Sequence, residues 1–119
     1  MTAEPRLHPG VIADAASVTL EHEPVPADQV VSGAPTTRPP SSSSTRCPVV
    51  GVWEMTPGAM RDVEADEVFV VLAGAATVEF EHPHAAPIVL APGSVVRLES
   101  GMRTIWTVRQ ILRKVYVAP

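Results

Sequence analysis

The sequence predicts an all-β domain of the sandwich or barrel type. Thirteen prolines and seven glycines interrupt the 119 residues so often that no long helix fits between them. Valine is the commonest apolar residue, and its branched side chain favours the pleated surface of a strand. Short apolar segments separated by turn residues favour a sandwich or barrel over alternating strands and helices.

Candidate strands follow one another at short intervals along the chain. We expect them at residues 18–21, 49–55, 68–72, 77–81, 88–90, 95–98, 104–108 and 112–117. Within 77–81, Val78 and Phe80 alternate with polar neighbours, which is the pattern of a half-buried strand. We expect Gly74-Ala75 to close a hairpin and Ala91-Pro92-Gly93 to form a turn, because glycine tolerates positive φ and proline presets the first turn position.

The first 48 residues differ in composition from the rest of the chain. We expect an arm over residues 1–31, with a short helical turn near 13–16 and an edge strand. Residues 32–48 are rich in Ser, Thr and Pro and carry too little apolar surface to order themselves, so they predict a loop. A lid or a dimer-swapped arm is the alternative. The arm and loop, residues 1–48, would pack on a barrel formed by residues 49–119, within one structural domain.

Charge and composition exclude several classes of partner and site. The net charge of −4 gives no basic surface of the kind that nucleic acid attracts. Cys47 is the single cysteine, so no intrachain disulfide can form, and the pattern suits a reducing compartment. No apolar run approaches the roughly 18 residues that span a bilayer, so we expect no membrane partner and a cytoplasmic location. Phosphate-binding glycine loops and nucleophile elbows are not found.

Two motifs lie in the second half of the chain. They read Pro57-Gly58 with Glu67-x6-Gly74, and Pro92-Gly93 with Glu99-x-Gly101-x2-Thr104. This pattern resembles the paired motifs of the cupin superfamily, and in detail the small cupins related to the ethanolamine-utilisation and ureidoglycine aminohydrolase groups. The resemblance implies a double-stranded β-helix, a jelly-roll-like barrel, with an N-terminal arm and pairing as a homodimer.

The same resemblance predicts that this member lacks the usual metal centre. Cupins that hold a metal supply two histidines shortly before the motif glutamate and a third three residues after the second-motif glycine. Here residues 60–66 contain no histidine, the third position is Thr104, and only Glu67 of the usual ligand set is present. Because transition-metal affinity needs several convergent donors, we expect neither a transition metal nor another cofactor.

Glu67 is the first candidate for a catalytic residue. The resemblance places it at the start of a strand with its side chain in the barrel, where apolar neighbours such as Phe69 suit a general acid or base. Arg103 or Thr104 would then stabilise developing charge. A structural ion pair of Glu67 with an arginine is an equal alternative, and the arginines considered are Arg61, Arg97 and Arg103.

Acidic residues before Glu67 form the densest run of charge in the chain. Asp62, Glu64 and Asp66 predict a solvated loop. The alternative is a metal site in which they act with Glu67 as hard oxygen ligands, which would suit manganese or magnesium.

Aromatic and apolar residues on the expected barrel strands are candidate ligand contacts. Alternate spacing puts Trp53 with Met55, and Thr104 with Trp106, on one face each. A barrel of this size either fills with side chains or holds one small ligand, so both interpretations stay open. The ligand-lining residues would be Trp53, Met55, Met60, Phe69, Met102, Trp106 and Tyr116.

Other polar residues are interpreted as surface features. His82-Pro83-His84 has the spacing of a metal-binding pair but falls at the expected tip of a hairpin, and His22 lies in the arm. Lys114, with Arg109 and Arg113, predicts solvated basic character on the last strands, because exposed ion pairs contribute little.

Three functions follow from these residues. The first is metal-free binding of a small apolar or weakly acidic molecule inside the barrel. The second is an isomerase, cyclase or lyase in which Glu67 moves a proton on a small carbonyl compound while Trp53 and Trp106 position it. The third is a metal-dependent enzyme with carboxylate ligands.

Overall fold

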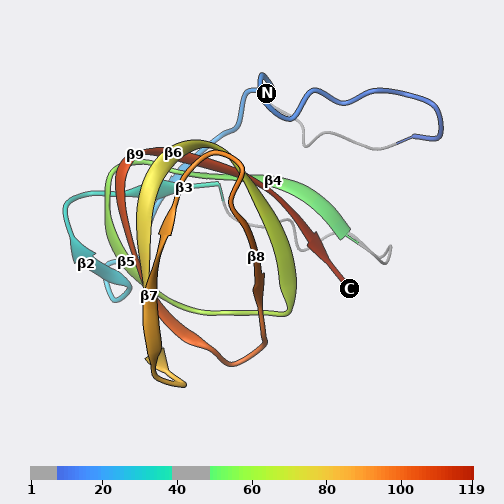
Figure 1. Ribbon diagram of the computed structural model, residues 1–119. Helices are drawn as coiled ribbons and strands as arrows, with labels where there is room; N and C mark the ends of the chain where they lie inside the picture. The colour runs from blue at the N-terminus through green and yellow to red at the C-terminus, as the bar shows by residue number, and fades with distance from the viewer. Residues whose placement is uncertain (1–7, 39–48) are drawn as a thin grey trace.

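The described part of the chain forms one curled antiparallel sheet. The structure is a computed structural model, and it describes residues 8–38 and 49–119. These residues contain nine strands and no helix, and Figure 1 shows the strands wrapping around a common interior. The all-β prediction and the barrel are confirmed.

Two long strands, each of 16 residues, organise the barrel. They are β6 (Glu67–His82) and β9 (Arg103–Ala118), and they pair with each other along most of their length. Two shorter strands, β8 (Val95–Leu98) and β7 (Ala85–Leu90), pair with the far edge of β6. Likewise β4 (Val49–Met55) and β5 (Gly58–Val63) pair with the far edge of β9. Right-handed twist accumulated over such long strands curls the sheet around one core.

Three short strands from the N-terminal part extend the same sheet. They are β1 (Glu23–Pro24), β2 (Val30–Ser32) and β3 (Thr36–Thr37). β3 pairs with β4, β1 pairs with β3, and β2 pairs with β5. Residues 23–37 are therefore part of the barrel wall.

The strand boundaries agree with the sequence prediction in some segments and differ from it in others. The segments 49–55 and 95–98 are strands with the predicted bounds, and Pro92 and Gly93 form the predicted turn. The predicted strand 18–21 is wrong, since the first strand begins at Glu23. Asp62, expected on a solvated acidic loop, lies on β5. The predicted loop 32–48 contains β3, and its residues 39–48 lie outside the described part. Residues 15–17 form a turn near the predicted position.

Gly74 does not close a hairpin, which corrects the sequence prediction. It lies inside β6 with φ of +100°, where the register with β9 shifts on both sides. A Cβ atom at this position would overlap the backbone carbonyl of Ile111 on β9. The glycine therefore allows two strand backbones to approach closely at a bend in β6. The sequence signal that predicted a hairpin turn marks this bend within one strand.

The barrel interior is packed with large side chains. Its core contains Trp53, Met55, Phe69, Val71, Val78, Leu90, Leu98, Trp106, Leu112 and Tyr116, all of them buried. Trp106 lies between Trp53 and Phe69, with ring centroids 5.5 and 5.7 Å apart. In the described part of the chain, no helix long and apolar enough to cross a membrane is found.

Candidate functional site

Polar side chains gather in one part of the barrel interior, which we call the polar end; its members are Asp62, Glu64, Glu67, Thr104 and Lys114. Met60 lies directly opposite Trp106 in the sheet, and Asp62 lies directly opposite Thr104. Because opposite residues share a face, all four point to the same side. Met60, Thr104 and Trp106 are buried and Asp62 is half-buried, so that side is the interior.

Lys114 on β9 places an ammonium group inside the barrel. The residue is only 4% exposed, and its Nζ lies 4.2 Å from the ring centroid of Phe69 and 4.8 Å from those of Trp53 and Trp106. Nζ donates a hydrogen bond of 2.9 Å to Oε1 of Glu67. Three aromatic faces and one carboxylate thus replace the water that an ammonium group loses on burial.

Glu64 is held by two side chains of β9. Its Oε2 accepts hydrogen bonds from the Thr104 hydroxyl and, at 2.9 Å, from Trp106 Nε1. The Glu64 backbone bonds with Met102 and Gly101, which ties the loop after β5 to the loop before β9. Glu64 is buried, so the prediction that it lies on a solvated loop is wrong.

At the polar end, Asp62 is the carboxyl group whose pKa shifts most clearly from its ordinary value. Burial raises the pKa of Asp62 to about 6, the negative charge of Glu64 adds to the rise, and the Lys114 ammonium partly opposes it. A backbone N–H of Val63 donates to Asp62 Oδ1 at 2.9 Å and favours the charged form. Asp62 can therefore exchange a proton just below neutral pH.

Of the three candidate catalytic residues, Glu67 and Thr104 face the barrel interior and Arg103 does not. Glu67 has its side chain on the same face as Phe69 and Val71, as expected, but its ion-pair partner is Lys114 and not one of the three arginines considered. Thr104 is buried, and its hydroxyl donates a hydrogen bond to Glu64 Oε2. Arg103 is exposed, and as the chain neighbour of buried Thr104 on β9 it lies on the outer face. The structure does not bring Arg103 together with Glu67.

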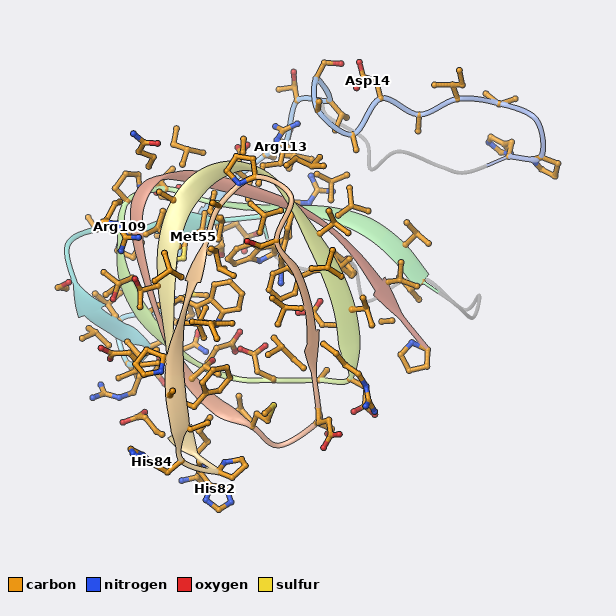
Figure 2. The ribbon with its side chains drawn as sticks, viewed as in Figure 1. Asp14, Met55, His82, His84, Arg109 and Arg113 are labelled. Atoms are coloured by element: carbon orange, nitrogen blue, oxygen red, sulfur yellow. The ribbon has the colours of Figure 1, made fainter. Side chains whose placement is uncertain are left out.

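Residues predicted to line a ligand all contribute to the core. Trp53, Met55, Met60, Phe69, Trp106 and Tyr116 belong to the buried cluster, and Met102 packs against it half-buried. Figure 2 shows Met55 pointing into the barrel. These side chains therefore pack the barrel interior as core residues.

Sequence reasoning missed Lys114, although a signal for it was present. Leu112 and Tyr116 are buried on the predicted last strand, and a period of two puts Lys114 on the same inward face. Glu64 carried no such signal, because its position depends on β5 and on the contact between two loops.

A second polar cluster fastens the arm to the barrel. Glu54 accepts hydrogen bonds of 2.7 Å from Arg113 Nε and forms one of 2.7 Å with His22 Nε2. Although burial acts to raise the pKa of Glu54, the bonds from Arg113 and His22 outweigh it and hold that pKa below its ordinary value. His22, expected to be incidental, and Glu54 therefore have a structural role.

The outer features of the β6–β7 hairpin agree with the sequence interpretation. His82 and His84 lie at its tip, away from the interior (Figure 2). An open hollow of about 570 Å³ lies beside it, lined by Glu79, Phe80, Glu81, His84, Ala85, Ala86, Pro87 and Ile105. Within residues 8–38 and 49–119, no group of three or more His, Cys, Asp or Glu side chains is placed to hold a metal ion.

Comparison with protein families decides the family of this barrel. Residues 43–116 match the model of the EutQ-like cupin domain. The chain belongs to the EutQ-like cupin family. The match covers both motifs and includes Glu64, Glu67, Thr104 and Lys114. The resemblance to small cupins related to the ethanolamine-utilisation group is confirmed.

Solved structures agree with this cupin fold. The ethanolamine utilization protein Q candidate of Salmonella typhimurium LT2 superposes with a TM-score of 0.68 at 17% identity, over 99% of this chain and 93% of that one. The EutQ protein of Clostridium difficile gives a TM-score of 0.66 at 14% identity, over 98% and 92% of the two chains. A DUF861 protein of unknown function from Pseudomonas syringae gives 0.68 at 20% identity, over 85% and 44%. The comparison with curated proteins gave no match.

Proposed function

We propose that this EutQ-like cupin binds a small molecule at the polar end of its barrel without a metal ion. The observation that carries the proposal is the pair of buried Lys114 with partly buried Glu67, in which Nζ lies 2.9 Å from Oε1. An ammonium group at that distance already neutralises Glu67 and would repel a divalent cation approaching the same carboxylate. Lys114 thus supplies, as part of the chain, the positive charge that a metal would otherwise bring.

The charge of the polar end supports a particular kind of ligand. Among the described residues that meet there, three carry carboxyl groups, namely Asp62, Glu64 and Glu67, whereas Lys114 carries the ammonium group. Surplus negative charge in a partly dehydrated site favours a protonated amine or a neutral hydrogen-bond donor and disfavours an anion. The proposal therefore departs from the weakly acidic ligand that the sequence suggested.

A size-matched set of probes tests the charge preference. Ethanolamine, ethylene glycol and glycolate are similar in size and are respectively positive, neutral and negative near pH 7. Ethanolamine is also a natural first choice because a similar structure is described as an ethanolamine utilization protein. We expect it to raise the unfolding temperature most and glycolate least, at matched ionic strength, with the effect of ethanolamine reduced in Asp62→Asn. Tighter binding of glycolate would contradict the proposal.

The second candidate function is enzymatic, and the environment of Asp62 favours it. A carboxyl group with a pKa of about 6 near the partly buried Lys114–Glu67 pair suits proton transfer on a small carbonyl compound, as in an isomerase, cyclase or lyase. Hydrogen–deuterium exchange of dihydroxyacetone in heavy water, followed by NMR, tests this function. We expect exchange catalysed by the wild type and lost in Asp62→Asn and Glu67→Gln. If the wild type catalyses no exchange, binding alone is the supported function.

A further inference from the structure

Lys114 is the only lysine in the chain. Nine residues are lysine or arginine, and the other eight are arginines. Within residues 8–38 and 49–119, this one lysine is also the only buried basic residue. The ion pair between Arg113 and Glu54 shows that arginine also serves in a partly buried pair of this fold. A guanidinium group keeps its proton in proteins, whereas an ammonium group can release one and become a nucleophilic amine. The choice of lysine therefore favours a role that a guanidinium group cannot fill.

The surroundings of the Lys114 ammonium group suit more than one kind of cation. Its Nζ lies 4.2 Å from the ring centroid of Phe69 and 4.8 Å from those of Trp53 and Trp106. Among the described residues, its one hydrogen-bond acceptor is Oε1 of Glu67, although an ammonium group has three N–H bonds. Ring faces attract a cation whatever its number of N–H bonds. A flat cation with a single N–H bond, such as an iminium ion, is therefore stabilised here as the ammonium group is.

Two carboxyl groups near the amine are placed to move its protons. Oε1 of Glu67 lies 2.9 Å from Nζ and accepts its hydrogen bond directly. Asp62 lies near enough for the Lys114 charge to act on it, and burial raises the pKa of Asp62 to about 6, so this group both gives and takes a proton near neutral pH. The Glu67 side chain is 14% exposed and Asp62 is half-buried, so both residues reach solvent at the polar end.

We propose that Lys114 binds a small aldehyde or ketone covalently, as a Schiff base, at the polar end. The inference rests on the proposed function, because the carbonyl compound must occupy the same site. Glu67 takes a proton from the ammonium group and passes it to the carbonyl oxygen as the amine attacks the carbonyl carbon and the C–N bond forms. Glu67 then removes a second proton from nitrogen, which leaves a neutral carbinolamine. Asp62 protonates its hydroxyl group, which departs as water while the nitrogen lone pair forms the C=N bond.

This reaction leaves the charge at Nζ unchanged. One ammonium group and one carbonyl compound give one iminium ion and one water molecule, and no oxidant or reductant is consumed. The iminium ion therefore keeps the Glu67 carboxylate and the three rings as its partners. Because carboxyl groups outnumber the ammonium group at the polar end, a neutral hydroxy-aldehyde or hydroxy-ketone is favoured over a keto acid.

Reductive trapping against an internal reference amine tests the proposal. Arg97→Lys introduces an exposed lysine on β8, because the Arg97 side chain is 72% exposed. The folded variant is treated with glycolaldehyde and sodium cyanoborohydride, which reduces an iminium ion to a stable secondary amine. Peptide mass spectrometry measures how fast each lysine gains a hydroxyethyl group. We expect Lys114 to react about tenfold faster than the introduced lysine, or more.

A lysine with only a structural role would give the opposite result. Burial would protect it, so a rate for Lys114 at or below that of the introduced lysine would overturn the proposal. The ratio of the two rates in protein unfolded by guanidinium chloride corrects for local sequence. Asp62→Asn in the Arg97→Lys background should slow trapping at Lys114 about tenfold and leave the introduced lysine unaffected. An unchanged rate at Lys114 would remove Asp62 from the reaction.

Failure of this inference is distinguishable from failure of the proposed function. Ethanolamine has no carbonyl group, so its effect on the unfolding temperature reports binding at the site without reaction at Lys114. If ethanolamine stabilises the protein and Lys114 is not trapped, only the Schiff base is rejected. Trapping of Lys114 without stabilisation by ethanolamine would uphold the Schiff base and reject the preference for a cation.

Discussion

Lys114 is the residue on which the chemistry of the interior depends. Its ammonium group is buried among three rings and is neutralised by Glu67. Because a buried charge without a partner is costly, the pair is expected to act as a unit in both stability and binding.

Removal of the Lys114 ammonium group should therefore lower the free energy of unfolding more than neutralisation of Glu67 does. We expect Lys114→Met to lower the free energy of unfolding by about 3 kcal/mol, because it leaves the Glu67 carboxylate partly buried without its partner. Glu67→Gln keeps an oxygen acceptor for the ammonium group and should cost about 1–2 kcal/mol. Urea unfolding checks both values, and a Lys114→Met protein as stable as the wild type would contradict the assigned pair.

Asp62 should make stability depend on pH in an unusual direction. Its folded pKa of about 6 exceeds its ordinary value of 3.8, so between these values the folded state holds a proton that the unfolded state has released. The contribution of Asp62 to the free energy of unfolding therefore falls as pH rises from about 4 to about 6. Asp62→Asn should remove this fall and make the protein more stable at pH 7 by about 1–2 kcal/mol.

Urea unfolding at pH values from 4 to 8 provides the measurement for Asp62. The amide of Asp62→Asn can still accept from the Val63 N–H, so the comparison isolates the charge. If wild type and variant show parallel pH profiles, Asp62 does not titrate in the way described.

Strands β6 and β9 show what local sequence patterns can and cannot predict. Alternation identified most of their length, because half-buried strands carry a period of two. Their continuity was missed, since Gly74 looks like a turn until the backbone of Ile111 is seen beside it. β5 was missed because Asp62 and Glu64 look solvated in sequence, and only pairing with β9 makes the strand.

Gly74 provides a test of the close contact between these strands. Gly74→Ala should destabilise the protein severely, because its Cβ would overlap the Ile111 carbonyl at a bend with positive φ. Gly93→Ala is a matched control, since Gly93 also has positive φ but an added Cβ would meet nothing within 4 Å. We expect a cost of about 1–2 kcal/mol for Gly93→Ala and a clearly larger one for Gly74→Ala by thermal unfolding. Equal costs would contradict the proposed contact.

The barrel as a whole was predictable from its motifs, and the site was predictable only in part. Glu67, Thr104, Trp53 and Trp106 were placed in the interior correctly because motif spacing and strand alternation both carry that information. Lys114 was missed although strand alternation places it on the inward face, whereas Glu64 enters the site through contacts between distant segments, which no local pattern encodes. The attachment of the arm to the barrel was also not predictable from local patterns. It depends on the bonds of His22 and Arg113 to Glu54, which join residues far apart in sequence.

The metal content of the purified protein tests the central claim most directly. We propose that the Lys114 ammonium group, and not a metal ion, neutralises Glu67 inside the barrel. Elemental analysis by mass spectrometry of protein prepared without chelators or added metal should give far less than one ion of manganese, iron, cobalt, nickel, copper or zinc per chain. One ion per chain that is retained by the wild type and lost in Glu67→Gln would contradict it.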